Sequence, residues 1–350
     1  MRSHRVLILG ASYGSLLGVK LALAGHSVSL VCLPHEAALI NERGTIVRMP
    51  VKGREGLVEV GSKDLPGRLD ALGPAEADPT RFELVALAMQ EPQYGAPGVR
   101  ELLERAALAR VPCLSIMNMP PLPYLARIPG VDPAKCAASY TNPAVWDAFD
   151  PALVTLCSPD PQAFRPPEEP VNVLQVRLPT NFKAARFESE THTAQLRGLE
   201  SDIAAARFHG LELPVKLKVH DSVFVPLAKW AMLLAGNYRC VQAGGMRSIR
   251  DAVLGDLEAS RAVYEWVVEL CIALGAERAD MVPFEKYAAA AQSLMSPSSA
   301  ARALAAGAPH IERVDRLVQS VASQHGLSNP GVDETVRLVD EWLVRNRRKG

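Results

Sequence analysis

A glycine-containing turn near the N-terminus is the first feature that could do chemistry. Residues 5–9 (RVLIL) predict a short buried strand, and residues 10–15 (GASYGS) lead from it into a helical pattern. Such a turn places backbone amides and a helix N-terminus where a pyrophosphate can bind. The dinucleotide pattern G-x-G-x-x-G is only partly matched, because Ser12 and Ser15 take its second and third positions and Gly14 comes one place early. The turn predicts a dinucleotide site, with glycines that serve only packing as the alternative.

A lysine within an apolar helix is the second such feature. Lys229 and Asn237 lie in residues 225–237 (VPLAKWAMLLAGN), whose pattern predicts a helix. Eight residues of α-helix leave two side chains about 80° apart around the axis, so both can line one cleft. Partial burial would lower the pKa of the Lys229 ammonium toward the range that is useful for proton transfer. The alternative is a packed lysine stem with its amine in solvent.

The elements that must position these residues begin with a βαβ unit. A strand, a glycine turn, a helix, a glycine and a second strand follow one another within about 30 residues, and such units cross over right-handed. Further strands are expected at residues 26–32, 82–89, 111–117, 137–140, 153–157 and 171–178, with helices at 15–24 and 98–108. This alternation predicts a doubly wound parallel sheet, with Asn118 at the carboxyl end of one strand.

The pattern changes from about residue 191, where strand-like runs give way to amphipathic helices. These are expected at residues 191–208, 221–236, 249–274, 284–294, 309–325 and 332–346. The fold class is therefore α/β followed by all-α. We expect a Rossmann dinucleotide-binding domain over residues 1–185 and an all-helical substrate and dimerisation domain over 186–350. A chain of 350 residues has the length of two domains.

Composition restricts the partners. Lysine plus arginine (38) equals aspartate plus glutamate (38), so no overall positive field favours nucleic acid. No run approaches the roughly 20 apolar residues of a membrane span. The six cysteines occur singly, without the spacing of metal ligands, which indicates reduced thiols in a cytoplasmic protein with no metal site.

Five features in this order resemble the ketopantoate reductase family. They are the start RVLILGASYGSLLG, the strand that ends at Asn118, the helix with Lys229 and Asn237, the pair Ser298-Ser299, and the closing helix from Pro309. The resemblance implies a Rossmann domain joined to a helical domain like the C-terminal domain of 6-phosphogluconate dehydrogenase. It also implies reduction of a small 2-oxo acid to the hydroxy acid with NADPH.

The resemblance also assigns roles to residues. Lys229 matches the catalytic lysine that supplies a proton to the substrate carbonyl. Asn237 matches an asparagine that orients the substrate, Ser299 a serine that binds its carboxylate, and Asn118 a residue between nicotinamide and substrate. The expected cofactor contacts are Gly10, Ser12, Tyr13, Gly14, Ser15, Gln90 and Asn118.

The sequence departs from the family at several of these positions, which marks a divergent member. Leu233 stands where a second asparagine is usual, so the substrate is expected to carry fewer hydroxyls. Either His310 or Glu312 takes the place of a glutamate that supports the lysine. Leu33 and Gln90 replace two cations that would bind a 2′-phosphate. NADP is the cofactor that the family implies, with NAD as the alternative.

Two other functions fit the same residues. An opine-type dehydrogenase has this two-domain plan and reduces an imine formed from an amino acid and a 2-oxo acid. A non-catalytic dinucleotide-binding or sensing protein would explain the imperfect glycine turn. The long apolar helices of the second half also permit a homodimer.

Overall fold

The computed structural model describes residues 3–348, and the chain forms two compact units. Unit 1 comprises Met1–Met89, Gln93–Tyr124 and Ala144–Asp221, and unit 2 comprises Gln90–Pro92, Leu125–Pro143 and Ser222–Gly350. The boundary expected near residue 185 falls inside unit 1, because β12 (Leu217–His220) pairs with β11 (Phe182–Ala185). Two loop segments from the first half of the chain belong to unit 2, which no local sequence pattern indicates.

Unit 1 is built on an eight-stranded sheet with the order β12-β11-β8-β7-β6-β1-β2-β5. Its remaining strands are β1 (Arg5–Leu9), β2 (Ser27–Val31), β5 (Arg68–Leu72), β6 (Leu84–Leu87), β7 (Cys113–Ile116) and β8 (Val154–Ser158). These six are mutually parallel, whereas β11 runs antiparallel to β8. The run from β5 to β8 has the Rossmann strand order, which confirms the doubly wound sheet.

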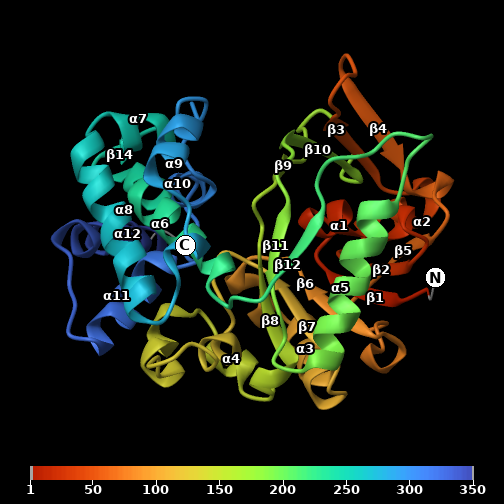
Figure 1. Cartoon of the computed structure of the whole chain (residues 1–350), viewed down its shortest axis with the longest axis horizontal. Coiled ribbons are helices and arrows are strands. Elements are labelled where there is room, and N and C mark those ends of the chain that lie inside the picture. Colours follow the sequence, from red (N-terminus) through yellow and green to blue (C-terminus); the bar gives the residue numbers. More distant parts are fainter. Residues whose placement is uncertain (1–2, 349–350) are drawn as a thin grey trace. The chain divides into compact units, whose positions relative to one another are not determined.

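Four helices of unit 1 accompany this sheet (Figure 1). They are α1 (Tyr13–Leu23), α2 (Pro34–Arg43), α3 (Val99–Leu108) and α5 (Glu190–Ala205). A right-handed crossover puts α1 and α3 on opposite faces, because their strands step away from β1 in opposite directions. Alternate residues of β1 and β2, such as Val6, Ile8 and Val28, are fully buried in one core with α1 and α5.

A second sheet of unit 1 has the strand order β4-β3-β10-β9. Its strands are β3 (Ile46–Pro50), β4 (Leu57–Gly61), β9 (Gln162–Phe164) and β10 (Val173–Leu178). Only β10 of these was expected from the sequence, because the others are half-buried and lack a continuous apolar run.

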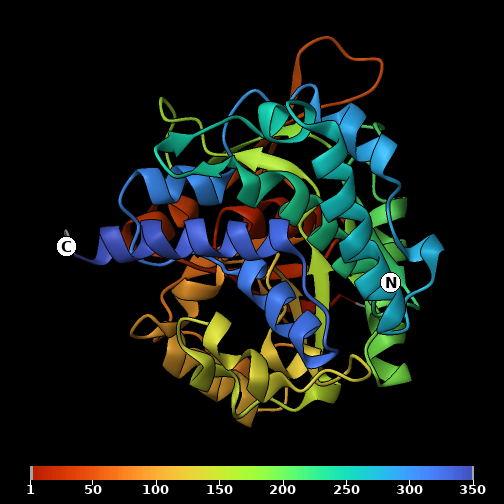
Figure 2. The same ribbon diagram turned by 90° about the vertical axis from the view of Figure 1, so that its left-hand side faces the viewer.

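Unit 2 is mostly helical, as expected. Its helices are α6 (Lys229–Met232), α7 (Ile249–Leu254), α8 (Leu257–Ala273), α9 (Phe284–Ala291), α10 (Ser299–Ala305), α11 (Val314–Gln324) and α12 (Pro330–Arg347). A hairpin of β13 (Val241–Gln242) and β14 (Gly245–Met246) interrupts them, and the short α4 (Leu122–Leu125) ends where unit 2 begins. Helix α11 packs beside α12 (Figure 2).

Two predicted elements are wrong. The strand expected at residues 137–140 is a 3₁₀ helix over Pro133–Ser139, whose first turn is capped by the Asp132 carboxylate accepting from Ala134 N at 3.0 Å. The statement that strands vanish after residue 191 also fails, because β12 extends the main sheet. The cap of the 3₁₀ helix is local, whereas β12 depends on β11, which is distant in the sequence.

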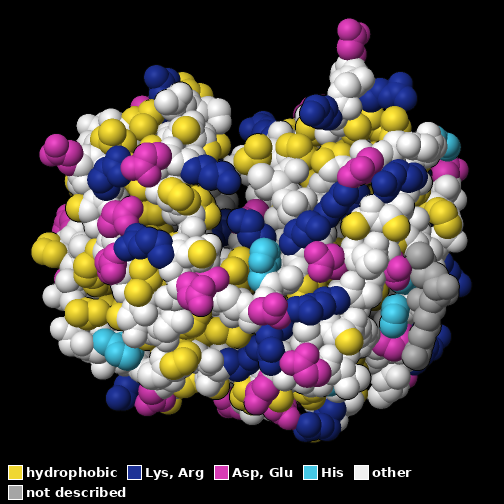
Figure 3. Space-filling model, in the orientation of Figure 1, with side chains coloured by type: hydrophobic (Ala, Val, Ile, Leu, Met, Phe, Trp, Pro, Cys, Tyr) yellow, Lys and Arg dark blue, Asp and Glu magenta, His cyan; other side chains and the backbone are white. Residues whose placement is uncertain are grey.

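The surface carries charges of both signs. On the face shown in Figure 3, lysine and arginine side chains are interspersed with aspartate and glutamate. Within residues 3–348 no helix has the length and apolarity to cross a bilayer. The six cysteines are free thiols. The expected homodimer stays a prediction.

Packing of α1 on the sheet yields a first testable prediction. A Cβ added at Gly14 would lie 2.7 Å from Ile8 Cγ2 in β1. We expect Gly14→Ala to lower the free energy of unfolding by about 1–3 kcal/mol through overpacking, measured by urea denaturation. Gly198→Ala is the matched control, because a Cβ there meets nothing within 4 Å and alanine favours the helix. Equal stability of the two variants would contradict the packing role of Gly14.

Candidate active site

The glycine turn follows β1 at the point where the strand order of the main sheet reverses. Gly10 has φ +104°, and a Cβ there would lie 2.6 Å from Met89 Cγ and 2.7 Å from the Ala88 carbonyl oxygen. Its amide donates to the carbonyl of Val31, the last residue of the partner strand β2, at 2.9 Å. Only glycine fits this conformation and this close approach. The turn therefore leads tightly from β1 into the N-terminus of α1.

The two serines of the turn differ in what their hydroxyls do. Ser15 is buried, and its hydroxyl donates to the Ala11 carbonyl at 2.5 Å. Ser12 is the N-cap residue of α1, but its side chain makes no capping bond, and the first turn holds no acidic residue. Tyr13 donates to the Pro161 carbonyl at 2.9 Å, and burial raises the pKa of its phenol. Ser12 is thus the serine placed to donate to an anion.

These features fit a pyrophosphate. In doubly wound sheets, dinucleotides bind outside the carboxyl ends of the strands where the order reverses, with the pyrophosphate on a helix N-terminus. Here β1 lies between β2 and β6, and α1 starts directly after the turn. An uncapped N-terminus leaves its amides for an anion from elsewhere.

Three further predicted positions follow strands of the main sheet. Asn118 lies two residues beyond β7 and is half-buried. Gln90 lies three residues beyond β6 and belongs by its contacts to unit 2. Leu33 lies two residues beyond β2 and is 60 % exposed, so no cation is present at this position of the chain.

Lys229 and Asn237 lie on one helical segment that changes its winding. Helix α6 continues into a π turn over Leu233–Asn237. A π turn holds more residues than an α turn, so the two side chains lie less than the expected 80° apart. Lys229, Met232 and Asn237 are the partly exposed residues between positions 229 and 237. Leu233, at the position where the resemblance implied a second asparagine, is 4 % exposed and packs inward.

A tyrosine from α9 holds the π turn. The Tyr287 hydroxyl donates to the Met232 carbonyl at 3.0 Å. A Cβ on Gly236 would lie 2.0 Å from that hydroxyl oxygen, so glycine is required there. The π turn that places Asn237 relative to Lys229 is therefore held by the Tyr287 hydroxyl, which occupies the space left by the absent side chain of Gly236.

Asn237 is tied to the start of α10. The Ser298 hydroxyl donates to the Asn237 carbonyl at 2.7 Å and accepts from Ala301 N at 3.2 Å as the N-cap of α10. Ser299 is the first residue of α10 and is exposed. The structure thus bonds Ser298, the residue before Ser299, to the main chain of Asn237, while the roles of Asn237 and Ser299 stay predictions.

Tyr238, the residue directly after Asn237, fixes the segment that precedes α11. The Tyr238 hydroxyl donates to the Glu312 carbonyl at 2.5 Å and accepts from Val314 N at 3.1 Å. The helix expected at residues 309–325 therefore begins only at Val314. Residues 310–313 are not helical, so the choice between His310 and Glu312 depends on their surroundings and not on a helical face.

His310 and Glu312 lie in different surroundings. His310 is exposed, and partial burial together with the nearby Arg347 guanidinium lowers its pKa. The Glu312 side chain is 8 % exposed and accepts from Glu91 N at 3.3 Å. Glu312 therefore faces the loop segment of unit 2 that follows β6.

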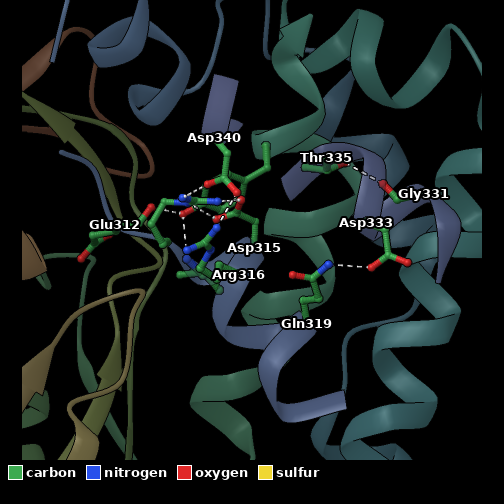
Figure 4. Close-up of polar contacts among 11 residues, drawn as sticks. Glu312, Asp315, Arg316, Gln319, Gly331, Asp333, Thr335 and Asp340 are labelled. Carbon is green, nitrogen blue, oxygen red and sulfur yellow. Dashed lines mark hydrogen bonds and ion pairs between the residues drawn. The ribbon is translucent and has the colours of Figure 1, made fainter. Parts of the chain in front are cut away.

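An ion-pair network anchors the opposite side of this segment. Arg313 donates two bonds of 2.9 Å to the fully buried Asp315 carboxylate and one of 2.6 Å to Asp340 on α12. Arg316 also pairs with Asp340. Figure 4 shows Glu312 pointing away from this network. Because the network fixes Arg313, the neighbouring Glu312 is held in the other direction.

Glu91 is a buried residue of this region that was not expected from the sequence. This carboxylate is 1 % exposed, accepts from Thr141 N at 3.0 Å, and has its pKa raised by burial. Burial raises the pKa of Tyr140 well above its usual value, and the negative charges of Glu91 and Glu312 add to this shift. The available signal was a carboxylate directly after Gln90, at the end of a strand.

The π turn yields the second prediction. Gly236→Ala is expected to destabilise the protein by about 1–3 kcal/mol, because its Cβ would overlap the Tyr287 hydroxyl. Tyr287→Phe should cost about 1 kcal/mol through the lost hydrogen bond. The double variant should cost less than the sum of the two in urea denaturation, since the clash is then relieved. Additive losses would show that the two residues do not act together.

Comparison with known proteins shows the fold. No protein-family model matches the sequence, and no curated protein matches it significantly. The structure is similar to that of 2-dehydropantoate 2-reductase from Methylococcus capsulatus, with a TM-score of 0.66, 15 % identity, and coverage of 98 % of this chain and 97 % of the other.

Two further solved structures are similar over nearly the whole chain. A PanE/ApbA family ketopantoate reductase from Ralstonia eutropha JMP134 has a TM-score of 0.61, 16 % identity, and coverage of 98 % and 99 %. D-mandelate dehydrogenase with NADH and anilino(oxo)acetate has a TM-score of 0.64, 14 % identity, and coverage of 98 % and 99 %. The chain therefore has the two-domain fold that ketopantoate reductases and D-mandelate dehydrogenase share.

Proposed function

We propose that this protein reduces a small 2-oxo acid to the 2-hydroxy acid with a reduced nicotinamide dinucleotide. The observation that carries the proposal is the π turn, which keeps Lys229 and Asn237 on the partly exposed side of one segment. Asn237 is in turn bonded to the residue before Ser299. A cation, an amide and a hydroxyl can bind the carbonyl and carboxylate of such a substrate.

The cofactor would be held by the glycine turn and the N-terminus of α1. The amides that follow Ser12 and the Ser12 hydroxyl would bind its pyrophosphate, while Gly10 gives the turn its tight path. When bound, the reduced nicotinamide supplies a hydride to the carbonyl carbon of the substrate. The similar structures that contain NADH support this assignment.

Lys229 acts as the proton donor. Its ammonium donates a hydrogen bond to the carbonyl oxygen and stabilises the negative charge that develops there. It then gives one proton to that oxygen, so a 2-oxo acid, a hydride and a proton together make a 2-hydroxy acid. Asn237 orients the substrate, Ser299 binds its carboxylate, and Asn118 takes the place between nicotinamide and substrate.

Glu312, rather than His310, supports the lysine. Glu312 is buried beside Glu91, and its backbone carbonyl accepts from Tyr238, the neighbour of Asn237. His310 is exposed near Arg347 instead. A carboxylate favours the protonated form of a nearby amine, which is the form that a proton donor needs.

The third prediction tests the proton donor. Lys229→Met should lower kcat for reduction of pyruvate, 2-oxoisovalerate or phenylglyoxylate by about 10²–10⁴-fold, because a general acid is lost. The assay follows oxidation of NADH and NADPH, and fluorescence titration should give unchanged dinucleotide affinity. Lys286→Met, which alters an exposed lysine of the same unit, is the matched control. Near-normal turnover of Lys229→Met would overturn the mechanism, as would oxidation that occurs only after an amine is added.

The fourth prediction separates the two candidates for the supporting residue. Glu312→Gln should lower kcat/KM and move the alkaline limb of its pH profile to lower pH, because the carboxylate that favours the charged lysine is gone. His310→Gln should leave both unchanged. A purely structural role of Glu312 would lower the rate without moving the limb. The reverse pattern would assign the role to His310.

A further inference from the structure

An ion pair lies at the end of β2, on the path of the proposed cofactor. Glu36 occupies the first turn of α2 and is 9 % exposed. Arg165 directly follows β9, and its Nη1 donates to Glu36 Oε1 at 2.5 Å. The two residues are 129 positions apart in the sequence. Arg165 follows a strand of the second sheet, so the residues directly after β2 gave no sign of a cation here.

Both charged groups lie close to the last residues of β2. Burial raises the pKa of the Cys32 thiol to about 12, the Glu36 carboxylate adds to this shift, and the Arg165 guanidinium opposes it. Cys32 is the residue directly after β2. The ion pair therefore lies where a Rossmann domain meets the ribose of a dinucleotide.

The same segment also touches the glycine turn. Tyr13, the first residue of α1, donates to the Pro161 carbonyl at 2.9 Å, four residues before Arg165. Residues 161–165 thus run from the turn that would hold the pyrophosphate to the end of β2. The pyrophosphate and the adenosine ribose are consecutive parts of a dinucleotide, so residues 161–165 would lie beside both.

Electrostatics decide which dinucleotide this arrangement favours. The Glu36–Arg165 ion pair is neutral as a whole, so it offers little net attraction to a second anion, and the group that the ribose would meet decides the preference. A ribose 2′-hydroxyl can donate to the remaining acceptor positions of a carboxylate. A 2′-phosphate would instead bring its negative charge up to Glu36, and the exposed Leu33 offers no cation in compensation.

We propose that Glu36, held in place by Arg165, reads the adenosine ribose and makes this protein prefer NADH to NADPH. The inference rests on the proposed function, since it concerns the same cofactor site. Glu36 is the residue that would contact the ribose. Arg165 is the positioning residue that fixes its carboxylate.

The experiment measures binding directly, without substrate. Fluorescence titration of the purified protein should give a dissociation constant for NADH about tenfold below that for NADPH, because a 2′-phosphate loses the hydrogen bond of the 2′-hydroxyl and meets a carboxylate whose charge Arg165 only partly offsets. Glu36→Gln keeps the size of the side chain, removes its charge and releases Arg165. It should tighten NADPH binding by about tenfold and weaken NADH binding. The gain for NADPH should shrink as salt is raised.

Two further variants serve as controls. Arg165→Met should leave NADPH the weaker ligand, because the carboxylate remains. Glu169→Gln removes the partner of Arg48, an ion pair of 2.6 Å in the second sheet of the same unit, and should leave the NADH to NADPH ratio unchanged. Circular dichroism checks that each variant is folded. If a variant does not fold, the ratio of the NADH and NADPH dissociation constants of the unaltered protein still tests the inference.

The outcomes separate this inference from the proposed function. Equal binding of both dinucleotides, a preference for NADPH, or a ratio that Glu36→Gln does not change would each overturn the role of Glu36 and leave the reductase standing. Failure of both dinucleotides to bind would overturn the proposed function itself.

Discussion

The hydrogen bond from Tyr287 to the Met232 carbonyl is the interaction on which the candidate site depends. A buried carbonyl needs a donor, and a π turn departs from the regular ladder that would supply one. Tyr287 provides the donor, and Gly236 leaves the space that its hydroxyl occupies. With the wider turn in place, Asn237 and Lys229 both remain partly exposed. An uninterrupted α-helix would turn Asn237 further from the lysine.

From this turn, backbone contacts extend to the other polar residues of unit 2. The Asn237 carbonyl accepts from Ser298, and the next side chain, Tyr238, binds the backbone on both sides of Arg313. The starts of α10 and α11 are thereby attached to consecutive residues of one segment. Side chains that the sequence separates by 60 residues or more, such as Ser298 and Asn237, are therefore positioned through main-chain atoms. Substitutions of Ser298 or Tyr238 would therefore affect the site by moving the main chain.

How much the sequence predicts depends on the range of the contacts. Strands β1, β6 and β7 are short, almost entirely apolar runs because both faces of the sheet are covered, and the glycine turn is equally local. The late start of α11 is set by Tyr238, and Glu91 belongs to a loop that folds with unit 2. No local pattern contains this information. The residues proposed for catalysis were found by family resemblance, whereas their supports required the structure.

Two buried carboxylates give unit 2 a region of strong local electrostatics that the balanced composition of the chain does not reveal. Glu91 and Glu312 are almost fully buried in one region of unit 2, and burial raises the pKa of Glu91. Charges in such surroundings act more strongly than charges in water. In the proposed reaction, an ionised Glu312 beside the Lys229 ammonium would keep the proton on the lysine until a stronger base forms. The oxygen of a carbonyl that accepts a hydride would be such a base, so the proposed pairing would link proton donation to the arrival of the hydride.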